Sequence, residues 1–321
     1  MTAAGLQMPG AGQRHEGELT AGLPVLAGWS WPYVAISGAQ DGPLTTIIAG
    51  IHGCEYVSIR AAVRLGRELE PAELRGRVLV VPIVNLPAFW SRTPFVCPID
   101  GKNPNRVFPG DPAGTFTEAL AHFIFTTCIA PSDAFLDLHG GDLVEELVPF
   151  TGYAGGADEA VAARSRAMAE AFGCPYIVAG RGGAAGGRAG LTHLAAAQHG
   201  VPSILAEAGG IGQLTAPEVD LLVEGTRRAL QVAGNLPGEP RPSVAARHIR
   251  QSATVTAPAD GFWAGDVRAG DTVHAGQRVG RLYGLLGEVL HEIDAPQDGV
   301  VLYRTTSAAV KAEGLLMNIG A

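Results

Sequence analysis

Short apolar runs alternate with helical patterns along most of the chain, and this alternation limits the folds available to it. Residues 44–50 are β-branched and apolar and end in glycine, which predicts a buried strand, whereas residues 56–69 carry apolar side chains at helical spacing. Such a chain forms an α/β domain with a parallel or mixed sheet covered by helices, and ligands bind beyond the carboxyl ends of its strands. Further strands are expected at residues 25–31, 33–36, 78–86, 134–138, 176–179 and 203–206, and helices at 117–129, 158–172, 191–198 and 217–232.

The junction between the first strand and helix of this alternation carries His52 and Glu55. An H-x-x-E pair at a strand-to-helix turn is a common way to present two zinc ligands. Zinc accepts imidazole nitrogen and carboxylate oxygen, and a catalytic zinc with three protein ligands leaves a position for water. Because the pair also occurs by chance, a third ligand and a base must come from elsewhere in the sequence.

His139 is the natural third ligand. It follows the expected strand 134–138 and precedes two glycines, so it takes a position equivalent to that of His52. Asp137 lies two residues earlier and points to the same face of the sheet. It either orients a ligand imidazole or is an ordinary strand-end carboxylate bonded to the backbone, and both interpretations remain open.

Glu207 is the candidate general base. It ends the expected strand 203–206 among small residues, where a carboxylate is unfavourable unless it is paired or catalytic. The alternative is a salt bridge to an arginine. The turn-rich segment 98–110 adds Arg106, whose planar guanidinium suits a carbonyl oxygen or a carboxylate. A loop whose asparagines satisfy its own backbone would also account for Asn103.

Composition excludes several classes of protein. The 321 residues are 47% hydrophobic, enough for a large core, and the net charge of -8 argues against a broad nucleic-acid-binding surface. No signal peptide is evident, and no apolar run approaches the ~20 residues of a membrane span, so we expect a cytoplasmic protein that binds no membrane. The four cysteines are scattered and are expected to be reduced.

A proline-rich stretch at residues 235–242 predicts a linker between a catalytic domain, residues 1–240, and a second domain, residues 241–321. The second domain contains a weak repeat, since residues 257–261 return as 295–299. It resembles the β-sandwich (barrel-sandwich) of lipoyl and biotinyl carriers, but the modifiable lysine between the two halves is missing. We expect an unmodified all-β module that is structural, caps the site or contacts another subunit.

Residues 180–190 are rich in glycine but lack the Lys-Ser/Thr ending of a phosphate-binding loop. This composition favours a mobile loop near the pocket.

Taken in order, four motifs resemble those of the succinylglutamate desuccinylase/aspartoacylase family, which has the zinc carboxypeptidase-like fold. They are Gly50-x-His52-Gly53-x-Glu55, Asp100-Gly101-x-Asn103-x-Asn105-Arg106-x-Phe108-Pro109-Gly110, Asp137-Leu138-His139 and Glu207. The β module also resembles that of family members, including bacterial deacetylases of N-acetylated diamino acids. The resemblance implies one Zn²⁺ per chain on His52, Glu55 and His139, a catalytic Glu207, substrate contacts from Asn105 and Arg106, and a homo-oligomer.

One position departs from this pattern. Aspartoacylase-like members have an arginine for the substrate carboxylate shortly before the Asn-Arg pair, at a position that here falls near Pro98. Arg92 is the nearest upstream arginine and is the candidate replacement. The expected activity is removal of an acyl group from an N-acyl amino acid or a related small amide. The alternatives are a zinc carboxypeptidase acting on peptides and a non-catalytic binding protein.

Overall fold

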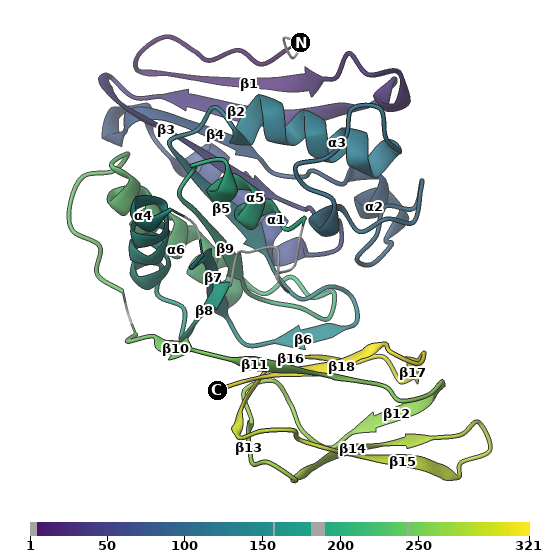
Figure 1. The fold of residues 1–321 in the computed structure, drawn as a ribbon. Coiled ribbons are helices and arrows are strands. Elements are labelled where there is room, and N and C mark those ends of the chain that lie inside the picture. The colour runs from purple at the N-terminus through teal and green to yellow at the C-terminus, as the bar shows by residue number, and fades with distance from the viewer. Residues whose placement is uncertain (1–4, 157, 181–189, 243) are drawn as a thin grey trace.

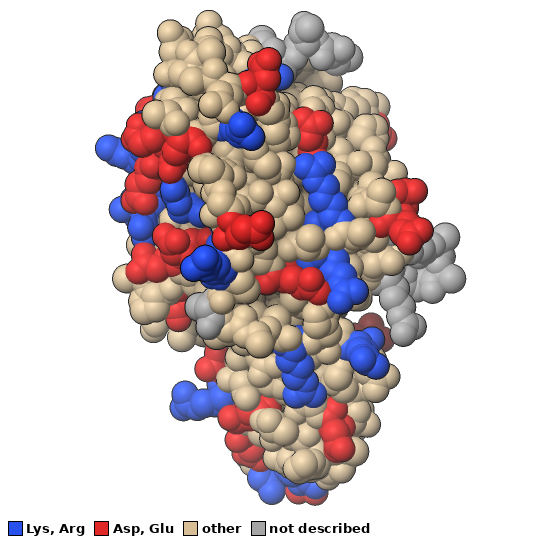
Figure 2. Space-filling view, turned by 90° about the vertical axis from the view of Figure 1, so that its left-hand side faces the viewer, with Lys and Arg blue, Asp and Glu red and all other residues tan. Residues whose placement is uncertain are grey.

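The computed structural model describes residues 5–156, 158–180, 190–242 and 244–321. The glycine-rich stretch expected to form a loop near the pocket therefore lies, for residues 181–189, outside the described residues. The larger α/β part lies above a narrower all-β part (Figure 1). On the face in Figure 2, acidic and basic side chains are interspersed over both parts. In the described chain, no helix is long and apolar enough to cross a membrane.

The described residues of the larger part form a nine-stranded mixed sheet. Its central strands β4, β3, β5 and β9 run parallel, and antiparallel pairs occur at β1–β2, β2–β4 and β7–β9. In spatial order the strands are β1 (Gln13–Thr20), β2 (Ser30–Ser37), β4 (Arg75–Val81), β3 (Gln40–Ala49), β5 (Ala134–His139), β9 (Ser203–Glu207), β7 (Phe150–Ala154), β8 (Tyr176–Gly180) and β10 (Arg247–Ile249).

Helices cover both faces of this sheet, as its buried strands require. Along β3, Ile47 and Ala49 join the core beneath one set of helices, whereas Ile48 joins the core on the opposite face. This alternation has the two-residue period of a strand buried on both faces. The first face packs α1 (Tyr56–Glu68), α4 (Glu159–Phe172) and α6 (Ala216–Ala233), and the second packs α3 (Phe116–Ile124) and α5 (Thr192–Gln198).

The structure corrects the extent of some expected elements. The strand expected at residues 78–86 ends at Val81, and residues Leu86–Ser91 form the short helix α2. Asn85 caps this helix by accepting a hydrogen bond from the N–H of Ala88, and a proline occupies its first turn. Both features favour a helix start over a continuing strand. The strand expected at 25–31 is largely replaced by a 3-10 turn, Pro24–Leu26, and α3 continues into a π-helical turn, Phe125–Ile129.

The C-terminal part consists of two antiparallel sheets around a core that includes Trp263, Leu282 and Met317. The repeated segments 257–261 and 295–299 take matching places, since each ends on the glycine that opens a strand. One sheet contains β11 (Ser252–Thr256), β18 (Leu315–Gly320), β16 (Gly299–Thr305) and β13 (Thr272–Val273), and the other β15 (Val289–Asp294), β14 (Arg278–Tyr283), β12 (Gly261–Gly265) and β17 (Ala309–Val310).

Strands from each part of the chain cross the expected boundary at residue 240. The strand β6 (Glu145–Leu147) leaves the larger part and pairs with β16 in the C-terminal sheet (Figure 1). In return, β10 follows the proline-rich stretch and still pairs with β8 in the large sheet. The two-domain division with its boundary at residue 240 stays a prediction, and the two parts share strands across it.

Candidate active site

Three neighbouring parallel strands bring the expected site residues to one edge of the sheet. The turn after β3 carries His52 and Glu55, β5 ends at His139, and β9 ends at Glu207. Because β3 pairs with β5 and β5 with β9, the three carboxyl ends lie side by side, and His139 is directly opposite Glu207. This is the edge where ligands bind in sheets of this class.

A tight turn after β3 aims the first two side chains inward. Gly50 has a φ of +64°, a left-handed conformation that favours glycine, and its carbonyl accepts a hydrogen bond from the N–H of Asn85. A Cβ on Gly53 would lie 2.3 Å from the backbone nitrogen of Phe89, so α2 packs directly against the turn. Glu55 then occupies the N-cap position of α1 without a capping hydrogen bond from its side chain, and both it and His52 are buried.

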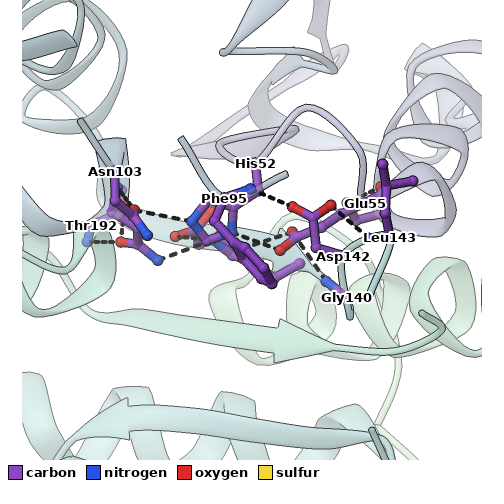
Figure 3. A network of polar contacts seen from close by, with 12 residues as sticks. His52, Glu55, Phe95, Asn103, Gly140, Asp142, Leu143 and Thr192 are labelled. Atoms are coloured by element: carbon purple, nitrogen blue, oxygen red, sulfur yellow. Dashed lines mark hydrogen bonds and ion pairs between the residues drawn. The ribbon is translucent and has the colours of Figure 1, made fainter. Parts of the chain in front are cut away.

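Two imidazoles converge on the carboxylate of Glu55. Nδ1 of His52 lies 2.6 Å from Oε1 of Glu55, and Nδ1 of His139 lies 2.9 Å from Oε2 (Figure 3). One ligand atom from each of the three residues lies within 4.8 Å of the others, so the group has the spacing of a metal site. The N–H of Gly140 also donates to Oε2 of Glu55 at 3.2 Å, which fixes the carboxylate.

The opposite ring nitrogens also lie beside polar groups. Nε2 of His52 lies 3.1 Å from Oδ1 of Asn103, and Nε2 of His139 lies 3.0 Å from Oδ2 of Asp137. Asn103 Oδ1 also accepts the N–H of Asn105, which identifies it as the amide oxygen. With a proton on Nε2 of His52, its Nδ1 lone pair faces Oε1 of Glu55. Two imidazoles and a carboxylate gathered at this spacing are a donor set that fits zinc.

The ionisation of these groups follows from the same arrangement. Burial alone would raise the pKa of Glu55, but the charges and hydrogen bonds of His139 and His52 lower it to about 2. Burial opposes a charge on His139, and the neighbouring carboxylates of Asp137 and Glu55 outweigh it and raise the pKa of the imidazole well above its usual range. The cluster therefore attracts positive charge.

The pKa of Glu207 is shifted in the opposite direction from that of Glu55. Burial raises its pKa well above the usual range, and the charges of Glu55, Glu145 and Asp137 act in the same direction against that of His139. Its Oε2 atom is buried and has no hydrogen-bond partner among the described residues. A carboxyl group of raised pKa beside a metal-type cluster is suited to accepting and releasing a proton.

The loop between α2 and α3 contributes residues at different depths. Asn105 is buried: its Oδ1 accepts hydrogen bonds from both N–H and Oγ1 of Thr192 at 2.9 Å, and its Nδ2 lies 3.4 Å from Nε2 of His139. Arg106 is exposed, and its guanidinium donates to the carbonyl of Asn105 at 2.6 Å. Arg92 is also exposed, with a φ of +56°, and no contact among the described residues joins it to the histidines.

A second set of residues around the cluster was not predicted from the sequence. Asp142 is fully buried and accepts hydrogen bonds from the N–H groups of Phe95 and Leu143 at 2.8 and 2.6 Å. This holds Phe95 at a φ of +59°, with its ring 6.2 Å from that of His52 (Figure 3). The signal available in the sequence was a carboxylate directly after His139 and its two glycines. Thr192 carried no comparable signal, because its role depends on a contact 87 positions away.

Comparisons with known proteins indicate the family of the chain. The succinylglutamate desuccinylase/aspartoacylase catalytic domain matches residues 41–233. The chain is 32% identical over 285 residues to the N-alpha-acetyl-L-2,4-diaminobutyric acid deacetylase of Halomonas elongata, covering 86% of this chain and 82% of that protein.

Solved structures show the same likeness over nearly the whole chain. A succinylglutamate desuccinylase/aspartoacylase from Rhodobacter sphaeroides is 29% identical with a TM-score of 0.84, covering 96% of this chain and 95% of the other. The product-bound ectoine utilization protein EutE (DoeB) of Ruegeria pomeroyi is 27% identical with a TM-score of 0.86, covering 98% and 97%.

Proposed function

The chain belongs to the succinylglutamate desuccinylase/aspartoacylase family, and from this membership we propose that it is a zinc-dependent hydrolase that removes the acyl group from an N-acyl amino acid. The observation that carries the proposal is the convergence of His52, Glu55 and His139 beside the buried carboxyl of Glu207. The deacetylase name of the Halomonas relative supports an N-acetyl amino acid as substrate.

In this proposal the metal is held by Nδ1 of His52, Nδ1 of His139 and the carboxylate of Glu55. When bound, zinc supplies Lewis acidity that acidifies water and polarises the acyl oxygen. Asn103 keeps the imidazole of His52 in the tautomer whose Nδ1 faces Glu55, and Asp137 lies beside Nε2 of His139.

Glu207 takes a proton from the attacking water and delivers it to the leaving nitrogen, which its raised pKa favours. Arg106, at the exposed side of the loop, is proposed to meet the acyl oxygen or a substrate carboxylate. Asn105, which lies beside His139, is proposed to contact the substrate. Arg92, directly after α2, is proposed to bind the substrate carboxylate.

The test combines metal analysis with a substrate panel. Purified protein is assayed for zinc content and for hydrolysis of N-acetyl amino acids and dipeptides, before and after thorough chelation and after zinc is restored. We expect about one zinc per chain, release of acetate from N-acetyl amino acids, and loss and recovery of activity with the metal. Preference for dipeptides would favour the carboxypeptidase alternative, zinc binding without hydrolysis would favour a binding protein, and activity unaffected by chelation would contradict the zinc mechanism.

A further inference from the structure

The turn that carries Phe95 has a strained backbone. Phe95 has a φ of +59°, a left-handed conformation that is unfavourable for a bulky side chain. The N–H of Val96 donates to the carbonyl of Pro94 at 2.7 Å, which closes a three-residue γ-turn around Phe95. Among the four non-glycine residues of positive φ in the described chain, Phe95 is the only one that is not exposed. Such a conformation persists only where the surrounding structure imposes it, and it occurs often at functional sites.

Asp142 imposes this conformation from a distant part of the sequence. The residue is fully buried, and its Oδ2 accepts the N–H of Phe95 at 2.8 Å across 47 positions. Its Oδ1 accepts the N–H of Leu143 at 2.6 Å, so backbone donors hold both oxygens of the carboxylate. The side chain therefore ties the γ-turn after α2 to the segment that follows His139.

The ring of Phe95 lies against the ligand cluster. Its centroid is 6.2 Å from that of the His52 imidazole, at an interplanar angle of 76°, which is an edge contact (Figure 3). His52 is buried and Phe95 is partly exposed, so the ring shields the imidazole from solvent on that side. An apolar ring suits the uncharged part of the substrate. In an N-acyl amino acid this part is the acyl group, since Arg106 and Arg92 are the proposed partners of the substrate carboxylate.

We propose that Phe95 limits the size of the acyl group and that Asp142 is the positioning residue that keeps its ring in place. This inference rests on the proposed deacylase function. The ring fills space beside His52 that a longer acyl chain would need. It has little freedom to move aside, because a buried carboxylate holds the backbone of the turn. Acetyl therefore fits, and each added methylene is disfavoured by its contact with the ring.

The test measures kcat/KM for the acetyl, propionyl and butyryl forms of the amino acid that wild type deacetylates fastest. Phe95→Gly removes the ring and relaxes the turn, since glycine adopts the left-handed conformation freely. In this variant the preference for acetyl over butyryl should fall about 10- to 100-fold, mainly through a lower KM for the butyryl substrate. Glu313→Gly relaxes an exposed left-handed residue in the C-terminal part and should keep the wild-type preference.

Asp142→Asn tests the positioning role, because asparagine offers one acceptor oxygen to two N–H groups. The acetyl preference should fall in this variant, and in the Phe95→Gly background the same substitution should cause no further fall, because the ring is already absent. An unchanged preference in Phe95→Gly overturns the role of the ring. Equal shifts from Asp142→Asn in both backgrounds overturn the positioning role.

Amide hydrogen exchange on wild type gives a second readout that needs neither turnover nor a folded Asp142 variant. The N–H of Phe95 should exchange at least about 100-fold more slowly than an unprotected amide, because exchange requires its bond to the buried carboxylate to break. Exchange at the unprotected rate would show that Asp142 does not hold the turn. Failure of wild type to hydrolyse any N-acyl amino acid would instead contradict the proposed function, and slow exchange at Phe95 would still show the hold of Asp142.

Discussion

Each histidine of the cluster is held at the ring nitrogen that faces away from Glu55. Nε2 of His52 contacts the amide oxygen of Asn103, and Nε2 of His139 contacts the carboxylate of Asp137, which is fully buried. Asp137 lies beside the imidazole of His139, and whether it orients a metal ligand stays a prediction.

Asn103→Ala should weaken zinc binding about 10- to 100-fold, because His52 loses the acceptor that fixes its tautomer. Competition titration against a chromophoric chelator measures the change. Asn103→Asp keeps an acceptor oxygen for both His52 and the N–H of Asn105 and should retain most of the affinity. Equal affinity in the alanine variant and wild type would show that the contact does not orient the ligand.

Glu207→Gln should retain zinc and lose turnover by about 10²- to 10⁴-fold, since the amide cannot accept the proton of the attacking water. Metal content and single-turnover rates are measured on the same preparation. Undiminished turnover in this variant would remove Glu207 from the mechanism.

Among individual residues, the side chains at strand ends could be predicted from the sequence, whereas the side chains that contact them from the loop could not. His52, Glu55, His139 and Glu207 each follow a recognisable apolar run, and the structure brings all four together. Asn103 was open to a local explanation, and its contact with His52 spans 51 positions. Local patterns carry no information on such a contact, which depends on how the loop folds over the sheet.

Among the elements, the short helix α2 sets the position of the ligand-bearing turn. Gly53→Ala would place a methyl group 2.3 Å from the Phe89 nitrogen and 2.9 Å from Cβ of Ala88. Because this contact is with backbone, the helix must move, and we expect a loss of stability of about 1–3 kcal/mol together with weaker zinc binding. Urea unfolding measures the first effect. The matched substitution Gly22→Ala, which meets no atom within 4 Å, should leave both properties close to those of wild type.

Buried strands and amphipathic helices could be predicted from the sequence, whereas short or exposed elements could not. The alternation of strands and helices from β3 to α6 was predicted with shifts at the ends, because buried strands and amphipathic helices leave strong local patterns. The apolar residues after β4 read as a longer strand, but Asn85 and the proline after it begin α2 instead. Strands β1 and β6 are partly exposed and polar, so neither left an apolar pattern.

For the molecule as a whole, the ion pair between Glu146 and Arg304 links β6 to the C-terminal sheet, and both side chains are largely buried. Arg304→Gln should lower stability by about 1–3 kcal/mol and raise KM more than it lowers kcat, because β6 loses a charged anchor. Arg281→Gln breaks exposed pairs within the C-terminal part and should change KM little. Equal kinetic effects of the two substitutions would show that β6 does not depend on this anchor.

The two-part architecture was predicted from the proline-rich stretch and the repeat, whereas the exchange of β6 and β10 between the parts was not. Pairing across such distances depends on tertiary contacts that neither segment encodes by itself. A cytoplasmic location, reduced cysteines and a homo-oligomeric state remain predictions from the sequence, and light scattering on the purified protein would measure the last.

The pairing of β6 with β16 also has a consequence for biosynthesis. Leu147 can pair with Tyr303 only after Tyr303 has left the ribosome. Until then β6 has no strand to pair with, and the core of the larger part can form before this pairing does. Contacts of such long range form late and slowly in folding. We therefore expect a polypeptide whose translation stops before β16 to lack the pairing that holds β6.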